Sequence, residues 1–340
     1  MSENKARLRD EPLWGGELLC GSAGGPLVEC IPNFSEGRRR DVVEAIAAAV
    51  QGVDGVIFLD SSMDPDHNRS VLTFAGPPSA VKLAAYRAIE EAARLINMEE
   101  HRGEHPRIGA ADVVPFVPLC GVTMGECVAL ARSLGGEVSS SLGIPVYLYE
   151  EAALVPERRD LAWVRRGGYE RLKREICNPE RRPDFGEPRL HPTAGAVAIG
   201  ARRSLVAFNI NLGTDDLEIA KKIASAVRAR SGGLAFVKAL GVKLASKGNV
   251  QVTMNLTDYT KTPIHRAFEL VRMEAEHYGV RVIGSEIIGL VPLQALLDVA
   301  GYYLRLDGLG LDNVLEARLL RERGLTDSLQ RGVEQNGHAE

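Results

Sequence analysis

The sequence has few of the short motifs that would assign a chemistry on their own. It contains no GxxxxGK(S/T) phosphate loop, no GxGxxG behind an expected strand and no GxSxG turn, so it supports neither the common nucleotide-binding domains nor a serine hydrolase. Its five cysteines are scattered, without a CxxC pair. This pattern favours neither a zinc knuckle nor a disulfide framework, and it predicts reduced thiols in a cytoplasmic protein.

Long apolar runs and a strong net charge are also missing. No apolar segment reaches the length that crosses a membrane, and residues 1–26 mix charges with glycine, unlike a signal peptide. The net charge of −4 gives no argument for binding nucleic acid or an anionic membrane. A hydrophobic content of 45% with 25% charged residues is typical of a globular protein, and 340 residues fit two domains.

What the sequence does contain is a repeat. The run LVECIPNF at residues 27–34 is echoed by LVAFNINL at residues 205–212, and an asparagine, Asn33 or Asn211, lies near the end of each. An alanine-rich helical stretch, two strand-like runs, a second helix and a last strand ending in Val-Pro-Leu follow in both halves. Each half is therefore predicted to fold as β-α-β-β-α-β, the ferredoxin-like unit. We predict an α+β fold in which two tandem ferredoxin-like subdomains form a cleft, a common kind of ligand site.

The repeat also predicts the boundaries. We expect a disordered N-terminal extension at residues 1–26 and a C-terminal segment at 308–340 that ends in a disordered tail. The two subdomains are expected at residues 27–200 and 201–307. Helices are predicted from apolar spacing at residues 79–96 (with Ser79 as N-cap), 123–134, 263–278 and 293–306, and the closing strands are predicted to end at residues 117–119 and 291–293.

One segment between the halves has a different composition. Residues 175–195 contain four prolines and two glycines, which predicts an extended loop that leads into the first strand of the second subdomain near Ser204. Such a loop lies where it could line a ligand, or it could be a simple linker.

Two polar clusters are candidates for chemistry. Residues 101–107, HRGEHPR, bring two histidines, a carboxylate and a guanidinium into one loop, and a neutral histidine can take up and return a proton. The same run matches HxxEH, which in zinc proteases places both histidines on one helix. Gly103 and Pro106 disfavour that helix, so a zinc hydrolase built on His101 and His105 is the weaker alternative.

The second cluster is DPDHNR at residues 64–69. It offers a guanidinium and an amide at the start of a strand, which suits the binding of a carboxylate, although a turn with local hydrogen bonds is the simpler interpretation. Turn chemistry is equally the simpler interpretation of Asn33 and Asn211. The residues alone leave both interpretations open.

Six motifs together resemble glutamate formiminotransferase. They are VECIPNFSEG (28–37), DHNRSV (66–71), GEHPRIGA (103–110), PVYLY (145–149), AFNINL (207–212) and GLVPL (289–293), and the similarity runs in order over residues 27–307. The resemblance implies two ferredoxin-like subdomains around a folate groove. It also implies transfer of a formimidoyl group from N-formimidoyl-L-glutamate to N5 of tetrahydrofolate in histidine degradation, with tetrahydrofolate as co-substrate and no metal or redox cofactor. A homodimer is the expected assembly. The animal proteins of this family carry a cyclodeaminase domain as well, which we expect to belong to another protein here.

The resemblance further implies site residues. His105 falls in the Gly-Glu-His-Pro-Arg motif and is expected to be the catalytic histidine. Donor-binding candidates come from the two polar clusters and the strand ends rather than from the resemblance, and they are Asn33, Asn68, Arg69, Arg107 and Asn211. The folate-binding loop is expected at Gly186, Glu187, Pro188, Arg189, Leu190, His191, Pro192, Thr193, Ala194 and Gly195. A related N-formyl donor, the handling of 5-formyltetrahydrofolate, and a folate-binding module without catalysis remain alternatives.

Overall fold

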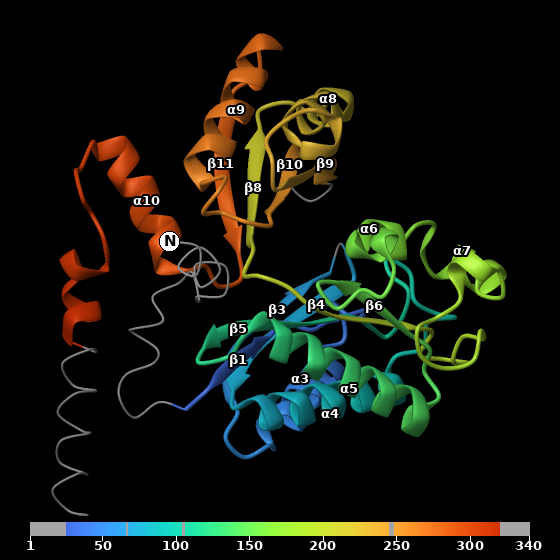
Figure 1. The fold of residues 1–340 in the computed structure, drawn as a ribbon. Coiled ribbons are helices and arrows are strands. Elements are labelled where there is room, and N and C mark those ends of the chain that lie inside the picture. Colours follow the sequence, from blue (N-terminus) through green and yellow to red (C-terminus); the bar gives the residue numbers. More distant parts are fainter. Residues whose placement is uncertain (1–24, 66, 104–105, 245–247, 320–340) are drawn as a thin grey trace, which may run out of the picture. The chain divides into compact units, whose positions relative to one another are not determined.

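The computed structural model describes residues 25–65, 67–103, 106–244 and 248–319 of the chain. The chain divides into two compact units, and the boundary falls between Arg202 and Arg203 (Figure 1). Both units combine helices with a largely antiparallel sheet, so the fold is α+β as the sequence predicts.

The first unit is built on one seven-stranded sheet. Its strand order is β3-β4-β1/β2-β5-β7-β6, where β1 and β2 occupy one position in the sheet. The pairs among β1 to β5 are antiparallel, whereas β7 runs parallel to both β5 and β6. Its elements are β1 (Leu27–Cys30), β2 (Asn33–Phe34), α3 (Arg40–Gln51), β3 (Ile57–Asp64), β4 (Arg69–Gly76), α4 (Pro78–Leu95), β5 (Ala111–Cys120), α5 (Met124–Leu142), β6 (Val146–Glu150), α6 (Leu161–Val164), α7 (Gly168–Glu175) and β7 (Val197–Ala201), with 3₁₀ turns η1 (Pro156–Arg159) and η2 (Pro179–Arg181).

The first strand of this unit is interrupted at Ile31 and Pro32. Both of its halves, β1 and β2, pair with β4 on one side and β5 on the other. Pro32 has no N–H to give to the sheet, but its carbonyl accepts a hydrogen bond from the Leu72 N–H at 3.1 Å. After the interruption the chain returns to the same position in the sheet, between β4 and β5.

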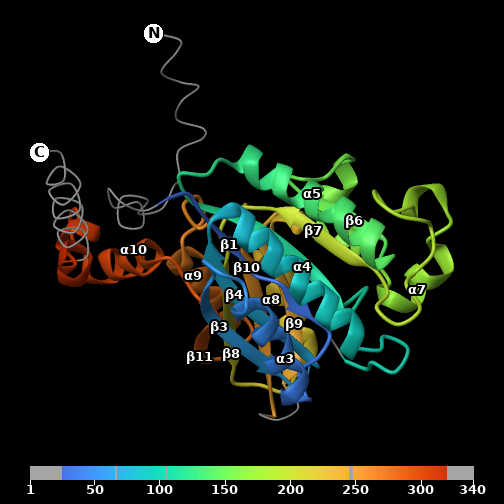
Figure 2. The same cartoon turned by 90° about the horizontal axis from the view of Figure 1, so that it is seen from below.

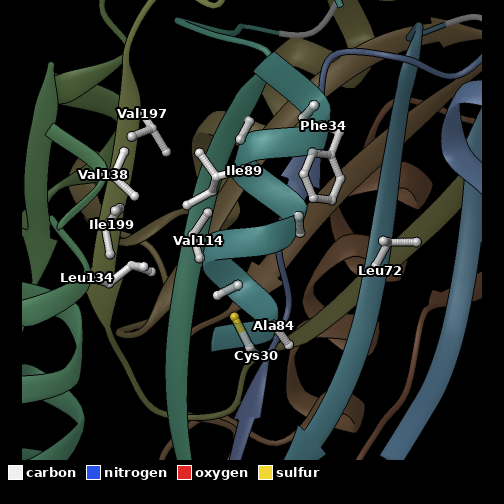
Figure 3. Close-up of a cluster of buried hydrophobic side chains, with 14 of the residues drawn as sticks. Cys30, Phe34, Leu72, Ala84, Ile89, Val114, Leu134, Val138, Val197 and Ile199 are labelled. Atoms are coloured by element: carbon white, nitrogen blue, oxygen red, sulfur yellow. The ribbon is translucent and has the colours of Figure 1, made fainter. Parts of the chain in front are cut away.

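Helices α3, α4 and α5 lie side by side on one face of the sheet (Figure 2). The face that α4 buries consists largely of alanine, including Ala84, Ala88 and Ala92, so the backbone approaches the strands closely. Figure 3 shows this core, in which Ile89 of α4 lies among apolar side chains that include Val114 of β5 and Ile199 of β7. The opposite face, at β5, β6 and β7, is covered by α6 and α7 over a smaller cluster that includes Ile108, Tyr147 and Leu172.

The second unit has a four-stranded antiparallel sheet in the order β11-β8-β10-β9. Helices α8 and α9 pack on this sheet, and α10 packs on α9. In α8 the buried residues Ala220, Ile223, Ala224 and Val227 recur at helical spacing, which explains the orientation of the helix. Its elements are β8 (Val206–Leu212), α8 (Leu217–Val227), β9 (Val237–Leu244), β10 (Asn249–Leu256), α9 (Ile264–His277), β11 (Val282–Ile288) and α10 (Leu293–Leu304), with 3₁₀ turns η3 (Ala229–Ser231) and η4 (Leu311–Asn313).

Several sequence predictions need correction. The tripeptide at residues 291–293 does not close a strand, because β11 ends at Ile288 and Leu293 begins α10. Pro77 rather than Ser79 is the N-cap of α4. The proline-rich loop leads into β7 of the first sheet, not directly into the second unit. Cys120 is disulfide-bonded, so the prediction of reduced thiols is wrong at that residue.

None of the helices in the described residues combines the length and the apolar character that a membrane crossing requires.

Candidate functional site

A polar hollow lies in the first unit where two loops meet the ends of the central strands. The lining comes from the end of β2, the β3–β4 turn, the start of β4, the loop at residues 96–110 and the start of β5. The residues that line it are Phe34, Ser35, His67, Asn68, Arg69, His101, Arg107 and Asp112. Three of the predicted donor-binding residues, Asn68, Arg69 and Arg107, therefore lie together although Arg107 is distant in sequence from the other two.

Asn68 joins the segments around this hollow. Its side-chain oxygen accepts a hydrogen bond from the Gly37 N–H at 2.9 Å, and its side-chain nitrogen donates to the Arg102 carbonyl at 2.9 Å. The residue is buried and adopts a φ of +50°, which asparagine tolerates better than most residues. The amide thus fixes the chain after β2 and the 96–110 loop against the β3–β4 turn.

Two glycines allow these segments to approach so closely. A Cβ atom on Gly37 would lie 2.3 Å from the Asp64 carbonyl oxygen, and one on Gly103 would lie 2.4 Å from the His67 carbonyl oxygen. Both obstacles are backbone atoms, which cannot move aside like the end of a flexible side chain. Gly103, which the sequence marked only as a poor helix former, is therefore required by the packing of the loop.

His101 is buried, with 7% of its surface exposed. Its Nδ1 accepts a hydrogen bond from the Arg107 Nε–H at 3.0 Å, and its Nε2 lies 3.0 Å from the Asn68 carbonyl oxygen. Because a carbonyl only accepts, Nε2 carries the proton and the ring is neutral. Burial is the largest cause that holds the pKa of His101 below its ordinary value, and the cation of Arg107 acts in the same direction.

Arg107 is held from two sides. Besides its bond to His101, its two terminal nitrogens donate to both carboxylate oxygens of Glu170 on α7, at 2.7 and 3.1 Å. This bidentate contact is the largest cause that lowers the pKa of Glu170. The Arg107 side chain is only 11% exposed whereas the Glu170 side chain is 58% exposed, so the carboxylate reaches in from the surface.

A second group of charges surrounds Asp112. This carboxylate is 3% exposed, accepts from the Ile108 N–H at 2.9 Å and pairs with Arg165 of the segment after α6. Burial first, and then repulsion by Arg165, lower the pKa of Arg69 to about 9, while Asp112 and Asp64 act in the opposite direction. Arg69 therefore keeps its charge at neutral pH. Three guanidinium groups gather near the hollow, which suits an anionic ligand such as a carboxylate.

His67 and Asp64 form a pair at the hollow. The His67 Nδ1 lies 2.6 Å from the Asp64 Oδ2, and the His67 N–H donates to Asp64 Oδ1 at 3.0 Å. A carboxylate in this position orients an imidazole and selects its Nδ1–H tautomer. The sequence marked this segment as polar but gave His67 no role.

The expected folate loop lies against the 96–110 loop. The backbone N–H groups of Met98 and Ala110 donate to the carbonyls of Thr193 and Ala194, each at 2.8 Å, and the Ala196 N–H donates to Ile108 at 3.0 Å. At the other end of the loop, Phe185 forms an antiparallel bridge with Val146. Residues 186–195 are thus anchored at both ends to the first unit.

The contact between these two loops leaves no room for side chains. Gly195 has a φ of +73°, and a Cβ there would lie 2.5 Å from the Ile108 carbonyl oxygen. A Cβ on Gly109 would lie 1.9 Å from the Ala196 carbonyl oxygen. Of the ten residues expected to bind folate, Ala194 and Gly195 are buried in this contact. The residues exposed to solvent are Gly186, Glu187, Arg189, Pro192 and Thr193.

Two further predicted site residues, Asn33 and Asn211, do not line the hollow. A third, His105, is outside the described residues. Asn33 is buried in β2, where its side chain donates to the Ile31 carbonyl at 2.9 Å, and it does not line the hollow. Asn211 lies on β8 of the second unit, where its side-chain oxygen accepts from Gln251 at 2.8 Å.

The zinc alternative finds little support in the geometry of His101. Both ring nitrogens are engaged, so coordination of a metal would first break the bond to Arg107 or to Asn68. Across the ranges that the structure describes, no group of three or more His, Cys, Asp or Glu side chains could hold a metal ion.

In a comparison with known proteins, both units match families. Residues 27–202 match the family described as "Formiminotransferase domain, N-terminal subdomain", and residues 207–323 match the "Formiminotransferase domain". The chain is 57% identical to a protein of Thermoplasma acidophilum named glutamate formimidoyltransferase, over 86% of this chain and 97% of that one. A protein of the same name from Streptococcus pyogenes serotype M1 is 45% identical over 86% of this chain and 99% of its own length.

A longer relative matches over part of its length. The formimidoyltransferase-cyclodeaminase of Mus musculus is 44% identical over 82% of this chain, which corresponds to 52% of the mouse protein.

Proposed function

Because this chain belongs to the formiminotransferase family, we propose that it transfers a formimidoyl group from N-formimidoyl-L-glutamate to N5 of tetrahydrofolate. The products are L-glutamate and 5-formimidoyltetrahydrofolate. The observation that carries the proposal is the 57% identity to a glutamate formimidoyltransferase over nearly the whole length of that relative. The arginine-rich hollow supports it, since the donor carries carboxylates.

The proposed fold is a tandem of ferredoxin-like subdomains at residues 27–200 and 201–307. Strand order supports this proposal. In the second unit the strands follow the order β11-β8-β10-β9, and in the first unit β5, β1/β2, β4 and β3 follow the equivalent order. In both units a helix links the first strand to the second and another links the third to the fourth, as the split βαβ arrangement requires.

The proposed reaction requires the transfer of a proton, which a side chain can perform without a metal or redox cofactor. The N5 amine attacks the amidine carbon of the donor, a tetrahedral intermediate forms, and the glutamate nitrogen leaves with a proton. One imidazole that takes the proton from N5 and gives it to the leaving nitrogen is sufficient, and we assign this role to His105. Such acid–base catalysis contributes roughly 10²- to 10⁴-fold, and alignment of the two substrates contributes further.

The donor carboxylates are proposed to bind Arg69 and Arg107, with Asn68, Asn33 and Asn211 as further candidates. Arg69 and Arg107 line the same hollow and have planar forks that match a carboxylate. In the structure the fork of Arg107 already holds the Glu170 carboxylate, which is the interaction that a donor carboxylate would replace. Asn68 supports the hollow through the two hydrogen bonds of its amide.

Tetrahydrofolate is proposed to bind the loop from Gly186 to Gly195 as co-substrate. The end of the loop is hydrogen-bonded to Met98 and Ala110, which precede and follow the GEHPR motif in the sequence, and these contacts support the assignment. Its exposed side chains, such as Glu187 and Arg189, are the part that can contact a ligand. We expect a chain with residues 187–192 shuffled to show a sharply raised KM for tetrahydrofolate. Unchanged folate kinetics in a folded variant would remove the loop from the site.

One experiment decides between the donors. The purified chain is incubated with tetrahydrofolate and a panel of N-formimidoylglutamate, N-formylglutamate and 5-formyltetrahydrofolate, and the N5-substituted product is measured. We expect the formimidoyl donor to give the highest kcat/KM. Preference for a formyl compound would reassign the donor, and binding of tetrahydrofolate without any product would identify a non-catalytic folate-binding module.

We also propose a cytoplasmic homodimer that binds small molecules rather than nucleic acid or membranes. Several apolar side chains of the second unit are exposed on α10, among them Leu296, Tyr302 and Leu304, and patches of this kind are common at protein interfaces. Sedimentation equilibrium of the whole chain tests the assembly, because a dimer has twice the mass of the chain.

A further inference from the structure

His101 has no assigned part in the reaction, yet both nitrogens of its ring have defined partners in the structure. Its buried ring bridges the β4 end of the hollow, through the Asn68 carbonyl, and the guanidinium of Arg107. We propose that neutral His101 is a positioning residue, which orients Arg107 for the donor carboxylate by accepting the Arg107 Nε–H at its own Nδ1. The proposal rests on the transferase function and adds to it the residue that sets the direction of the carboxylate-binding fork.

The chemistry of the contact admits one protonation state. An arginine N–H only donates, so the Nδ1 that faces it at 3.0 Å must keep its lone pair. A backbone carbonyl only accepts, so the Nε2 that faces Asn68 must carry the proton. Protonation of Nδ1 would turn one N–H toward another and bring two cations together. The contact and the charged imidazolium therefore exclude each other.

The orientation of Arg107 depends on this contact because the other hydrogen bonds of the guanidinium involve its terminal nitrogens and not its Nε. Its terminal nitrogens bind Glu170, a carboxylate on α7 that is 58% exposed. If the bond to the His101 ring were lost, the fork would be held only through its terminal nitrogens, by Glu170 and by the His101 backbone carbonyl, which accepts at 3.3 Å. His101 keeps the guanidinium in the lining of the hollow, where the Arg107 side chain is 11% exposed.

The charged groups around His101 agree with a neutral ring. Arg107 of the same loop and Arg38 of the segment after β2 disfavour a positive charge there, whereas Glu36 favours it. The Asn68 carbonyl, at the start of β4, also favours a protonated ring, but burial outweighs these contributions.

Substitutions can separate the two hydrogen bonds of His101. Asparagine at this position puts an acceptor oxygen where Nδ1 lies and cannot be protonated, whereas glutamine puts an N–H donor where Nε2 lies. We expect His101→Ala and His101→Gln to raise the KM for formimidoylglutamate by roughly tenfold to a hundredfold, the value of a hydrogen bond to a charged group, with kcat changed much less. His101→Asn should remain within about threefold of the wild-type KM.

The pH dependence provides a signature that a merely structural role would not give. In the wild type the donor KM should rise as the pH falls through the pKa of His101, which burial holds below its ordinary value, since protonation of His101 releases Arg107. In His101→Asn this rise should disappear. His265→Asn, in a histidine of the second unit that stacks on Tyr302, is the matched control and should leave the donor KM unchanged.

The outcomes separate the proposal from its alternatives. Recovery in His101→Gln but not in His101→Asn would show that the bond to Asn68 matters and that to Arg107 does not, which overturns the proposal. An unchanged KM in His101→Ala would overturn it as well.

A measurement on the wild-type chain tests the proposal without relying on turnover. Nitrogen-15 NMR of the histidine rings, with the His101 signals identified by their loss in His101→Asn, should show a proton on Nε2 and none on Nδ1 at neutral pH. Saturation with L-glutamate should leave this tautomer in place. A proton on Nδ1, or a ring that is charged at pH 7, would overturn the positioning role. Absence of turnover with this tautomer present would instead count against the proposed function.

Discussion

The two units share an order of strands and helices and differ in the loops that connect them. In the first unit the segment between the second helix of the repeat and its last strand runs from residue 96 to 110, whereas the equivalent segment of the second unit spans only residues 278–281. The long segment supplies His101 and Arg107 to the hollow. The short one joins α9 directly to β11. The longer connection of the first unit thus completes a polar hollow that the β3–β4 turn and the strand ends also line.

The hairpin of each unit shows the same contrast at the level of single residues. In the β3–β4 hairpin Asp64 is paired with Arg69, and in the β9–β10 hairpin the corresponding pair is Leu244 and Asn249. The backbone register is the same, but only the first pair places a guanidinium at the start of the strand. The comparison teaches that strand order and register do not determine chemistry, which depends on the side chains at the ends of the strands.

Of the substitutions considered, loss of His105 should show the largest difference in activity between a change in the first unit and a matched change in the second. His105→Ala should lower kcat by roughly 10²- to 10⁴-fold while folding and folate binding persist, because acid–base catalysis is lost and a polar loop carries little packing energy. His101→Ala should leave kcat much closer to the wild type. His277→Ala is the matched control, since His277 ends α9 just before the short connection of the second unit. Steady-state kinetics of the three variants decide, and a near-normal kcat in His105→Ala would reassign the catalytic residue.

Breaking a buried charge pair in the first unit should destabilise the protein more than breaking an exposed pair in the second unit. Asp112→Asn leaves the buried cation of Arg165 uncompensated and should lower the free energy of unfolding by about 3–5 kcal/mol. Glu269→Gln, in the exposed pair with Arg272 on α9, should cost about 1 kcal/mol or less. Urea denaturation of the whole chain measures both. Equal losses would mean that the Asp112 pair is not a buried one in solution.

Glycine substitutions compare close packing in the long loop with an open position in the second sheet. Gly103→Ala would bring its Cβ to 2.4 Å from the His67 carbonyl, and we expect a loss of about 1–3 kcal/mol together with a raised donor KM. In Gly284→Ala the nearest atom lies 3.9 Å away, on the Asn211 side chain, so the change should stay within about 0.5 kcal/mol. Thermal unfolding and kinetics report the two effects. A normal donor KM in Gly103→Ala would show that the loop can shift without harm.

The smallest expected effect concerns pH. The pKa of His101 is lowered in the folded protein, by burial and then by Arg107, so the unfolded chain binds more protons between that pKa and its own value of about 6.5. Stability is therefore fully present above about pH 6.5 and falls as the pH drops through the folded pKa. His101→Asn should flatten this slope. Denaturation midpoints from about pH 7.5 to 5.5 test it, and an unchanged slope in the variant would contradict the assignment.

Much of the order of strands and helices could be predicted from the sequence because it depends on local patterns of residues. Apolar periodicity and the repeated asparagines predicted the alternation of strands and helices, and polar turns pointed to Asn68, Arg69 and Arg107. The Val-Pro-Leu tripeptide misled, since proline is tolerated in β5 at Pro118 and equally before a helix at Pro292. A short pattern of this kind carries no information about its partners in space.

The support of the site could not be predicted, because it depends on long-range contacts. Nothing near Asp112 in the sequence announces that it pairs with Arg165, and charged residues are seldom buried. His101 resembled a solvated loop residue until its contacts with Asn68 and Arg107 were known. The same holds for Ser35, whose hydroxyl donates to the Gly109 carbonyl at 2.7 Å.

The backbone contacts of residues 193–196 with Met98, Ile108 and Ala110 separate a fixed end of the proposed folate loop from a part that protein engineering can vary. Insertions or new side chains at Gly195 would collide with the Ile108 carbonyl and move the loop that carries Arg107. Glu187 and Arg189 are exposed and lie outside that contact, so their replacement changes the ligand surface without shifting its foundation. A library that aims at altered folate specificity should therefore vary residues 187–192 and keep residues 193–196 unchanged.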